Sequence, residues 1–406
     1  MSKAPLLPVA DALARVLASA PEPLPTEIVA LTQARGRTLA QDVAALRTQP
    51  PFPASAMDGY AVRAADIAQV PARLKVTGVS AAGHRFHGAL GAGEAVRIFT
   101  GAPVPDGADT ILIQENATAE DGFVVAHEPE EAGRHIRRAG LDFSAGDVLL
   151  ARGRRLGPPE LALAAAMNHP ALPVTRRPRV ALLATGDELV RPGENAGPDQ
   201  IVASNTYAVA AYAEAAGAEV IDLGIAGDRF ADLERCIRAA RDAGADVLVT
   251  LGGASVGDHD LVQTALSREG MELGFWRIAM RPGKPLMHGR IGDMRILGLP
   301  GNPVSAIVCG VLFLVPLVRA LAGDPQAGSD RSELAVLGAD LPANDSRQDY
   351  MRAHVTGMRD GHPLVEAFRR QDSSMLRVLA QAECLIIRDA HAPPARAGET
   401  CRMMRL

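Results

Sequence analysis

Residues 245–260, ADVLVTLGGASVGDHD, decide the expected fold, because an apolar run ends abruptly in a glycine-rich turn that is followed by acidic residues. The first half has the length and the β-branched content of a buried parallel strand. In doubly wound α/β folds, ligands bind in the crevice beyond the carboxyl ends of the strands. We therefore predict a site at the polar and glycine residues that follow this strand: Gly252, Gly253, Ser255, Gly257, Asp258 and Asp260.

The chemistry of this turn favours a metal-bound phosphate. Glycine allows bare backbone amides to approach a ligand closely, whereas the two acids alone would repel a phosphate. Carboxylate oxygens beside such amides suit a Mg²⁺–phosphate pair. The alternative is that Gly252 and Gly253 only form a tight connection.

A strand–loop–helix pattern repeats from residue 179 onward. RVALLAT (179–185) is predicted to be a strand, EVIDLGIAGD (219–228) contains the next strand and its loop, and the opening stretch supplies the third strand. Ser204 or Asn205 is expected to be the N-cap of the helix between the first two strands. Glu188, Asp228 and Asp260 each follow one of these strands. Because the carboxyl ends of parallel strands share one edge of the sheet, we predict that these three acids form a Mg²⁺ and phosphate site.

A basic turn lies in WRIAMRPGKPLMHGR (276–290), between two predicted strands. Arg281 and Lys284 beside Gly283 offer an oxyanion both charge and backbone approach. A solvated surface turn is the alternative. The uncharged stretch 300–318 is long enough to cross a bilayer, but its opening PGNP turn favours the buried helix of an α/β unit.

The flanking sequence predicts a multidomain α/β plus β protein. Helical patterns at 9–20 and 157–167 and extended crossings at 47–53 and 140–150 indicate a discontinuous first domain, which surrounds β-like runs over 74–126. Residues 326–406 carry short β-like runs without helical periodicity and predict a β-barrel or sandwich. The expected parts are an extended two-segment domain (1–46 and 140–177), a small β domain (47–139), a doubly wound α/β domain (178–325) and a C-terminal β-barrel (326–406).

Composition excludes several classes of function. The 406 residues carry a formal net charge of −5, which argues against nucleic acid as the main partner. The four cysteines are far apart and form no Cys-x-x-Cys pair, so neither a zinc site nor a disulfide framework is expected. Prolines and charges interrupt any N-terminal signal peptide, and we expect a cytoplasmic protein without a membrane span.

With these residues assembled, the chain resembles the molybdopterin molybdenumtransferase family, which includes the E domain of gephyrin, along nearly its whole length. The matching motifs are SAMDGYAV, TGAPVPDGADTILIQE, GLDFSAGD, LLATGDEL, SNTY, LGGASVGDHD, MRPGKPL and GLPGNPVS. The resemblance implies four domains and an elongated homodimer, with an active site between the α/β domain of one chain and the small β domain of the other.

The resemblance also implies an activity, which is Mg²⁺-dependent insertion of molybdate into adenylylated molybdopterin with release of AMP. The active-site positions carried over by motif are Asp58, Thr100, Asp142, Glu188, Asp228 and Asp260. The substrate positions are Gly252, Gly253, Ser255, Arg277, Arg281, Lys284, Ser305 and Arg347 with Ser373 or Ser374; the loose C-terminal motif leaves Arg352 as an alternative to Arg347. Many relatives carry Lys where Arg277 and Arg281 stand, so contacts to the substrate there can differ.

We expect electrostatic rather than nucleophilic catalysis, because no Ser-His-Asp or Cys-His constellation is evident. Two other functions remain open. The α/β unit also resembles the domain that adenylylates molybdopterin, and gephyrin uses a domain of this family as a scaffold for receptor tails. Expected partners beyond the second subunit are the molybdopterin adenylyltransferase and the molybdoenzymes that receive the cofactor.

Overall fold

The computed structural model describes residues 6–253 and 261–406, and the chain divides into two compact units. The first unit consists of Met1–Glu27, Gly36–Ala40 and Pro173–Leu406, and the second consists of Ile28–Arg35 and Gln41–Leu172. The chain therefore passes from the first unit into the second twice, briefly at Ile28–Arg35 and then for the long segment Gln41–Leu172. Each unit is described by itself.

The first unit is built around a six-stranded sheet with the order β16-β13-β17-β21-β20-β18. Four neighbouring strands are parallel, and the last two pair antiparallel. The strands are β13 (Arg179–Thr185), β16 (Glu219–Ala226), β17 (Val247–Leu251), β18 (Glu272–Trp276), β20 (Met287–Ile291) and β21 (Met294–Leu299). Residues of β17 are all buried, as a parallel strand covered on both faces requires.

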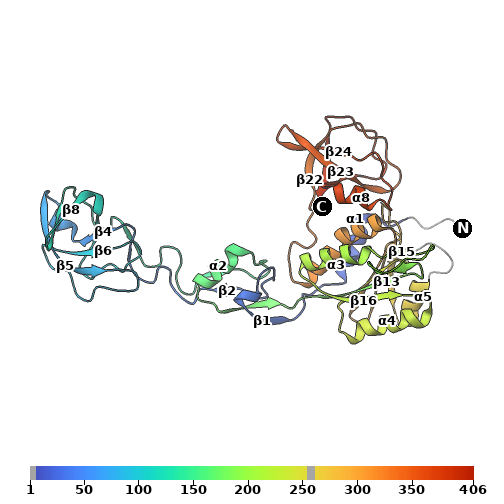
Figure 1. The fold of residues 1–406 in the computed structure, drawn as a ribbon, viewed down its shortest axis with the longest axis horizontal. Helices are drawn as coiled ribbons and strands as arrows, with labels where there is room; N and C mark the ends of the chain where they lie inside the picture. Colours follow the sequence, from blue (N-terminus) through green and yellow to red (C-terminus); the bar gives the residue numbers. More distant parts are fainter. Residues whose placement is uncertain (1–5, 254–260) are drawn as a thin grey trace. The chain divides into compact units, whose positions relative to one another are not determined.

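Helices cover both faces of this sheet (Figure 1). Val180 and Leu182 of β13 pack in one apolar cluster, while Ala181 and Leu183, which alternate with them, pack in another. The first cluster includes α1 (Val9–Ala18), α3 (Asn205–Ala216), α6 (Pro303–Cys309) and α7 (Val315–Leu321), and the second includes α4 (Phe230–Asp242) and α5 (Leu261–Arg268). The predicted doubly wound α/β domain is confirmed, with an added antiparallel edge.

Among the described residues, the helical segment Pro303–Leu321 is the one that could be mistaken for a membrane span. It is long and apolar enough by length and composition, but 83% of its apolar window is buried inside the protein. A π-helical turn, η4 (Gly310–Leu314), joins α6 to α7 just before Pro316, which has no N–H to continue the α-helical ladder. The prediction of a buried core helix is confirmed, although the helix begins at Pro303 rather than at Pro300.

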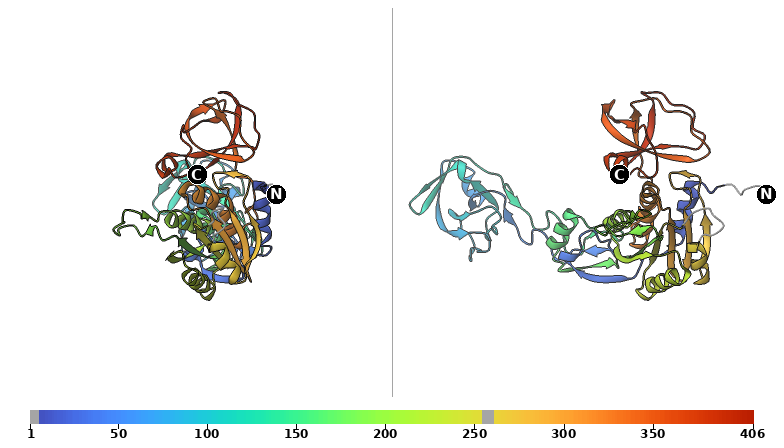
Figure 2. Two further views of the ribbon diagram at one scale, coloured as in Figure 1. Left: turned by 90° about the vertical axis from the view of Figure 1, so that its right-hand side faces the viewer. Right: turned by 45° about the vertical axis from the view of Figure 1, so that its right-hand side comes forward.

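The C-terminal part of the first unit is a closed five-stranded β-barrel, shown in Figure 2 in orange and red. Strand β23 pairs with both β24 and β25, which closes the order β23-β24-β22-β26-β25 on itself. The strands are β22 (Glu333–Leu337), β23 (Gln348–Arg359), β24 (His362–Ala367), β25 (Cys384–Arg388) and β26 (Thr400–Arg405), and β19 (Met280–Arg281) pairs with β23 from outside.

The predicted C-terminal β-barrel is confirmed, and this part also holds a helix that the sequence analysis did not predict, α8 (Leu376–Gln381). Six residues are too few to display a helical period in the sequence. Leu379 and Leu376 pack against the apolar cluster of the α/β domain, so tertiary contacts stabilise this turn and a half of helix.

The second unit contains the predicted small β domain. Its sheet has the order β7-β4-β6-β5-β9-β8, and the strands are β4 (Gly59–Val62), β5 (Ala72–Ser80), β6 (Glu94–Ile98), β7 (Thr110–Ile113), β8 (Ala117–Glu120) and β9 (Phe123–Ala126). The predicted second helix is α2 (Pro158–Ala166), where Glu160 accepts a hydrogen bond from the Gly157 N–H at 2.9 Å. Short strands β2 (Val43–Ala44), β3 (Ala54–Ser55), β10 (Ile136–Arg137) and β11 (Val148–Leu150) pair along the two crossings.

The remaining short elements complete the chain. They are β1 (Thr26–Ala30), β12 (Ala171–Thr175), β14 (Leu189–Val190), β15 (Ile201–Val202) and the 3₁₀ turns η1 (Leu31–Gln33), η2 (Ala64–Ile67) and η3 (Gln114–Asn116).

Candidate active site

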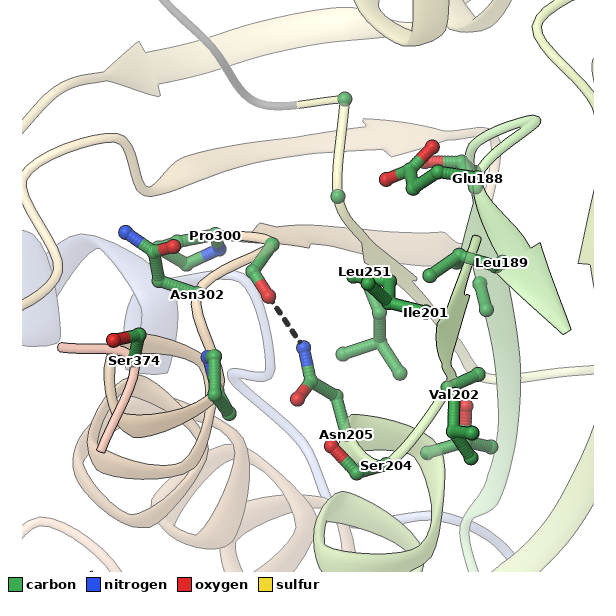
Figure 3. A pocket seen from close by; sticks show the side chains of 18 of the residues that line it. Glu188, Leu189, Ile201, Val202, Ser204, Asn205, Leu251, Pro300, Asn302 and Ser374 are labelled. Atoms are coloured by element: carbon green, nitrogen blue, oxygen red, sulfur yellow. Dashed lines mark hydrogen bonds between the residues drawn. The ribbon is translucent and has the colours of Figure 1, made fainter. Parts of the chain in front are cut away.

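A pocket of about 600 Å³ opens beyond the carboxyl ends of the central parallel strands, and we call it the strand-edge pocket (Figure 3). Figure 3 shows Glu188 on one side of it and Asn302 and Ser374 on the other. Its wall is formed by Ala184, Thr185, Glu188, Leu189, Ile201, Val202, Ala203, Ser204, Asn205, Thr206, Leu251, Gly252, Gly253, Pro285, Pro300, Gly301, Asn302, Pro303 and Ser374. The pocket thus lies where the sequence predicts a site.

The glycine turn after β17 forms the floor of the pocket, and its two glycines are sterically required. Gly252 has φ +105°, and a Cβ there would lie 2.8 Å from the Thr185 carbonyl oxygen. Gly253 has φ +63°, and its Cβ would lie 2.1 Å from the Val262 side chain. Any other residue would displace the turn. The Gly252 N–H donates to the Leu299 carbonyl at 3.1 Å, so Gly253 is the glycine whose bare backbone can meet a ligand.

Thr185 is a site residue that the sequence prediction missed. Its hydroxyl is buried and has no hydrogen-bond partner within the part of the chain that the structure describes. A buried hydroxyl without a partner costs about 1–3 kcal/mol, so such groups are rare unless a ligand or water completes them. The signal in the sequence is its place as the last residue of β13, directly before Gly186.

The N-terminus of α3 faces the same pocket. Ser204 is the N-cap residue, but no side chain caps the first turn, and Ser204, Asn205 and Thr206 all line the cavity. The Asn205 side chain, the other predicted N-cap candidate, instead donates a 2.7 Å hydrogen bond to the Gly301 carbonyl (Figure 3). The first amides of this 12-residue helix therefore lie at the pocket wall, where their dipoles favour an anion.

The predicted metal acids follow the expected strands. Glu188 lines the pocket, and its carboxylate lies so close to Gly186 that a Cβ there would be 2.2 Å from an oxygen. Asp228 is exposed after β16, and its N–H donates to the Asp187 carboxylate at 3.1 Å. Asp260 and Ser255 lie outside the described residues. Among the described residues, no three His, Cys, Asp or Glu side chains form a group that could hold a metal ion.

The α6 side of the pocket is organised by the barrel loop that precedes α8. The Ser373 carbonyl accepts the Val304 N–H at 3.0 Å, and the Ser373 hydroxyl accepts the Asn302 side-chain N–H at 3.0 Å. Ser374 lines the pocket and donates to Asp372 at 2.6 Å, while Ser305 is buried within α6. Asn302 is therefore a second pocket residue that was missed, although it lies in the quoted GLPGNPVS motif.

Two arginines that were predicted to bind the oxyanion are already paired with carboxylates. Arg281 donates to Asp349 at 3.0 Å and to Asp345 at 3.2 Å, and Arg347 donates to Asp345 at 2.8 Å. The hydrogen bond with Asp349 raises the pKa of Arg281, and the one from Arg347 holds the pKa of Asp345 below its usual value. We call these four residues the arginine–aspartate network.

Three other cations are not paired with a carboxylate in the part of the chain that the structure describes. Lys284 is exposed, and no carboxylate pairs with it among residues 6–253 and 261–406. Arg277 has φ +77°, stacks 4.4 Å from the Trp276 ring centroid and leaves its buried Nε without a described partner. Arg352 is only 1% exposed, and its guanidinium donates to the Asp372 carbonyl at 3.0 Å, beside the Ser373 and Ser374 turn. Burial lowers the pKa of Arg352.

The three remaining predicted residues belong to the second unit. Asp58 accepts hydrogen bonds from the Thr100 N–H at 2.7 Å and from its hydroxyl at 2.8 Å. The bond from the backbone of Thr100, followed by that from its side chain, holds the pKa of Asp58 below the usual range. Asp142 is exposed in a turn, and its N–H donates to the Gln49 carbonyl at 3.0 Å.

Three family models match the chain in succession. The MoeA N-terminal region (domain I and II) matches residues 7–168, a probable molybdopterin binding domain matches 181–320, and the MoeA C-terminal region (domain IV) matches 334–406. The strand-edge pocket lies mainly in the part of the chain that matches the second model.

Relatives and solved structures agree with these matches. The chain is 35% identical to a molybdopterin molybdenumtransferase of Haemophilus influenzae, over 97% of each chain, and 34% identical to one of Bacillus subtilis, over 93% of this chain and 89% of that one. A solved molybdopterin biosynthesis MoeA protein from Pyrococcus horikosii superposes with a TM-score of 0.83 at 30% identity, over 99% of each chain. The chain therefore belongs to the molybdopterin molybdenumtransferase family of transferases.

Proposed function

We propose that this protein inserts molybdate into adenylylated molybdopterin and releases AMP. The observation that carries the proposal is the strand-edge pocket, in which the glycine turn, the uncapped N-terminus of α3 and Glu188 converge on one cavity. Its volume lies within the range of about 300–1,000 Å³ that small-molecule sites occupy. The names of the relatives support the reaction class.

The backbone of the pocket would bind the phosphates of the adenylylated substrate. Gly253 and the first amides of α3 lie at the cavity wall, and the helix dipole favours negative charge at this end. The unpartnered Thr185 hydroxyl would donate to the same ligand. These contacts hold the scissile linkage in one orientation, which lowers the entropic part of the barrier.

The donor set fits Mg²⁺. In phosphate-handling enzymes Mg²⁺ takes one or two protein carboxylates and completes its shell with water and substrate phosphates, so a preformed group of three acids is not required. Glu188 and Asp228, which follow the adjacent strands β13 and β16, would hold it together with the predicted ligand Asp260. When bound, the ion would neutralise charge on the pyrophosphate linkage during release of AMP.

The molybdate would be held where unpaired cations meet hydroxyl groups. Lys284 and Arg277 are the cations of the basic turn that no carboxylate of the described residues neutralises, and Arg352 supports the loop that carries Ser373 and Ser374. Arg281 and Arg347 would act indirectly, by fixing the turn to the barrel through Asp345 and Asp349. This arrangement favours Arg352 over Arg347 and Ser374 over Ser373 beside the oxyanion.

We further propose a cytoplasmic homodimer in which Asp58, Thr100 and Asp142 of one chain complete the pocket of the other. The Asp58–Thr100 pair supports this role, because it fixes an ionised carboxylate in a unit separate from the pocket. Mixing an inactive Thr100→Ala chain with an inactive Glu188→Gln chain would then restore about a quarter of the wild-type activity, because random pairing of two chains leaves one intact site in half of the dimers. No recovery on mixing, or only monomer in analytical ultracentrifugation, would contradict the shared site.

The decisive experiment is an assay of AMP release from adenylylated molybdopterin, with molybdate and Mg²⁺ each present or omitted. We expect release that requires both, and tungstate in place of molybdate measures the choice of oxyanion. Consumption of ATP with free molybdopterin would indicate the adenylyltransferase instead. Ligand binding without turnover under any of these conditions would favour the scaffold.

A further inference from the structure

The second unit contains a cavity of its own, with a volume of about 600 Å³, that no predicted active-site residue lines. Residues from four separate stretches of the chain form it, and those that matter for its chemistry are Phe52, Arg85, Phe86, His87, Asp106 and Arg138. We call it the arginine-lined cavity.

The arginines of this cavity are not paired with a carboxylate in the part of the chain that the structure describes, although Asp106 lines the same cavity. Neither Arg85 nor Arg138 forms an ion pair, although other arginines of the same unit do, such as Arg73 with Glu120 at 2.8 Å. Two guanidinium groups at one cavity are the standard way in which proteins recognise a phosphate.

The cavity also presents aromatic rings in fixed positions. The Phe86 ring packs against two glycines, because a Cβ would lie 2.5 Å from it at Gly78 and 3.1 Å from it at Gly88. The Arg85 guanidinium lies 5.9 Å from the centroid of the Phe52 ring. Rings held in this way can stack on a flat ligand without a large loss of side-chain entropy.

The surrounding backbone keeps the cavity preformed. The Leu90 N–H donates to the Asp106 carbonyl at 2.8 Å, and the Val104 N–H donates to the Pro53 carbonyl at 2.9 Å. Gly107 has φ +86°, and a Cβ there would lie 2.6 Å from the Leu90 carbonyl oxygen. These contacts fix the loop that carries Asp106 against the segments that carry Arg85 and Phe52.

We propose that the arginine-lined cavity binds a nucleotide-like ligand, with a phosphate at Arg85 and Arg138 and a planar ring against Phe52 and Phe86. Asp106 accepts a hydrogen bond from an exocyclic amine or a sugar hydroxyl of the ligand. The size of the cavity suits one nucleotide. This inference is independent of the proposed function, which concerns the strand-edge pocket of the other unit.

The test uses the full-length protein and three probes, namely AMP, ribose 5-phosphate and inorganic phosphate. Isothermal titration gives the affinities, and a photoactivatable azido derivative of AMP, followed by peptide mapping, gives the location. We expect cross-links to peptides that contain Phe52 or residues 85–88. Cross-links confined to residues 201–206 or 252–253 would report the strand-edge pocket and overturn the proposal.

Matched variants separate a built site from general attraction to positive charge. Arg138→Ala and Arg85→Ala should each weaken AMP binding at the cavity by about tenfold, the loss expected for one charge-assisted hydrogen bond. Arg137→Ala removes the same charge one residue away without lining the cavity and should change the affinity less than twofold. Equal losses in Arg137→Ala and Arg138→Ala would refute the proposal.

A further variant distinguishes a nucleotide from a free phosphate. Phe52→Leu keeps an apolar side chain but removes the ring, so it should weaken AMP several-fold and leave inorganic phosphate unchanged. If all three probes bind equally and Phe52→Leu has no effect, the cavity recognises phosphate alone and the nucleotide proposal fails.

Discussion

The strand-edge pocket and the arginine–aspartate network belong to the same unit but differ in whether their polar groups have side-chain partners. In the pocket, the Thr185 hydroxyl and the first turn of α3 are left without side-chain partners. In the network, Arg281 and Arg347 are both neutralised by Asp345 and Asp349. The pocket has the unpaired groups that a ligand can complete, whereas the network has the paired charges that join the basic turn to the barrel.

The contrast corrects an inference from charge alone. Arg281 and Lys284 are three residues apart in one basic turn, and the sequence assigns both to the oxyanion. The carboxylates of the barrel distinguish them, because they pair with Arg281 and leave Lys284 free among the described residues. A cation that is already hydrogen-bonded to a buried carboxylate binds a further anion more weakly, because its charge is neutralised and its N–H donors are occupied.

The largest expected effect is at Glu188. Glu188→Gln keeps the size of the side chain but removes its charge, and we expect AMP release to fall by more than the roughly 100-fold that loss of an outer metal partner costs. Stopped assays over a range of Mg²⁺ concentrations measure it. Asp199→Asn is the control, since this exposed acid of the same loop region does not line the pocket. Full turnover in Glu188→Gln would show that Glu188 has no role in the reaction.

Lys284→Ala should have the next largest effect. Losing one charge-assisted contact of roughly 1.5–3 kcal/mol should lower the affinity for molybdate by about ten- to a hundredfold. Binding of the adenylylated pterin should change much less, because its phosphates are assigned to the glycine turn and to Mg²⁺. Separate titrations of the two ligands measure this, and an unchanged molybdate dependence would place Lys284 on the solvated surface.

Arg281→Ala should mainly cost stability. Asp349 is 6% exposed, and removing its arginine leaves a buried carboxylate short of donors, at a cost of about 1–3 kcal/mol. Denaturant unfolding measures the loss, and Arg281→Lys should restore part of it because one contact remains. If Arg281→Ala keeps full stability but loses molybdate dependence as strongly as Lys284→Ala, the contrast between the two residues is wrong.

Asn205→Ala should have a smaller effect on stability, of about 1 kcal/mol, because it removes the hydrogen bond to the Gly301 carbonyl. That bond joins α3 to the turn before α6 across the pocket, so the affinity for the adenylylated pterin should fall as well. Thermal unfolding with and without the pterin measures both changes. Asn195→Ala, exposed and outside both the pocket and the network, controls for general effects of asparagine loss.

The smallest expected effect is a shift in the titration of Asp58. Thr100→Val removes the hydroxyl bond but keeps the backbone bond, so the pKa of Asp58 should rise only part of the way to its usual value. Because the folded-state pKa is lowered, the stability from this carboxylate is present above the unfolded-state pKa and is lost as pH falls through the folded-state pKa.

Carboxyl NMR titration measures that shift directly. Asp372, whose pKa is lowered chiefly by the Ser374 hydroxyl, serves as an internal reference that Thr100→Val should leave unchanged. An Asp58 that titrates as in the wild type would show that the hydroxyl does not contribute. The acid limb of the stability curve should then also be unchanged.

The sequence by itself determines the elements whose signals are local. The continuous buried run of β13, the positive φ of Gly252 and Gly253, and the acids at strand ends all follow from residues close together in the chain. Four of the predicted site residues that the structure describes line the strand-edge pocket: Glu188, Gly252, Gly253 and Ser374. Local patterns suffice there because parallel strands bring their carboxyl ends to one edge.

Only the tertiary structure decides which polar groups find partners. Arg281 and Asp349 are 68 residues apart, and Asn205 and Gly301 are 96 residues apart, so no local period reports their contact. Helix α8 is equally invisible in the sequence, since six residues gain their stability from packing against the α/β domain rather than from helix propensity. Pairing depends on distances that exist only after folding, and those distances distinguish the cations that are paired with carboxylates from those that are not.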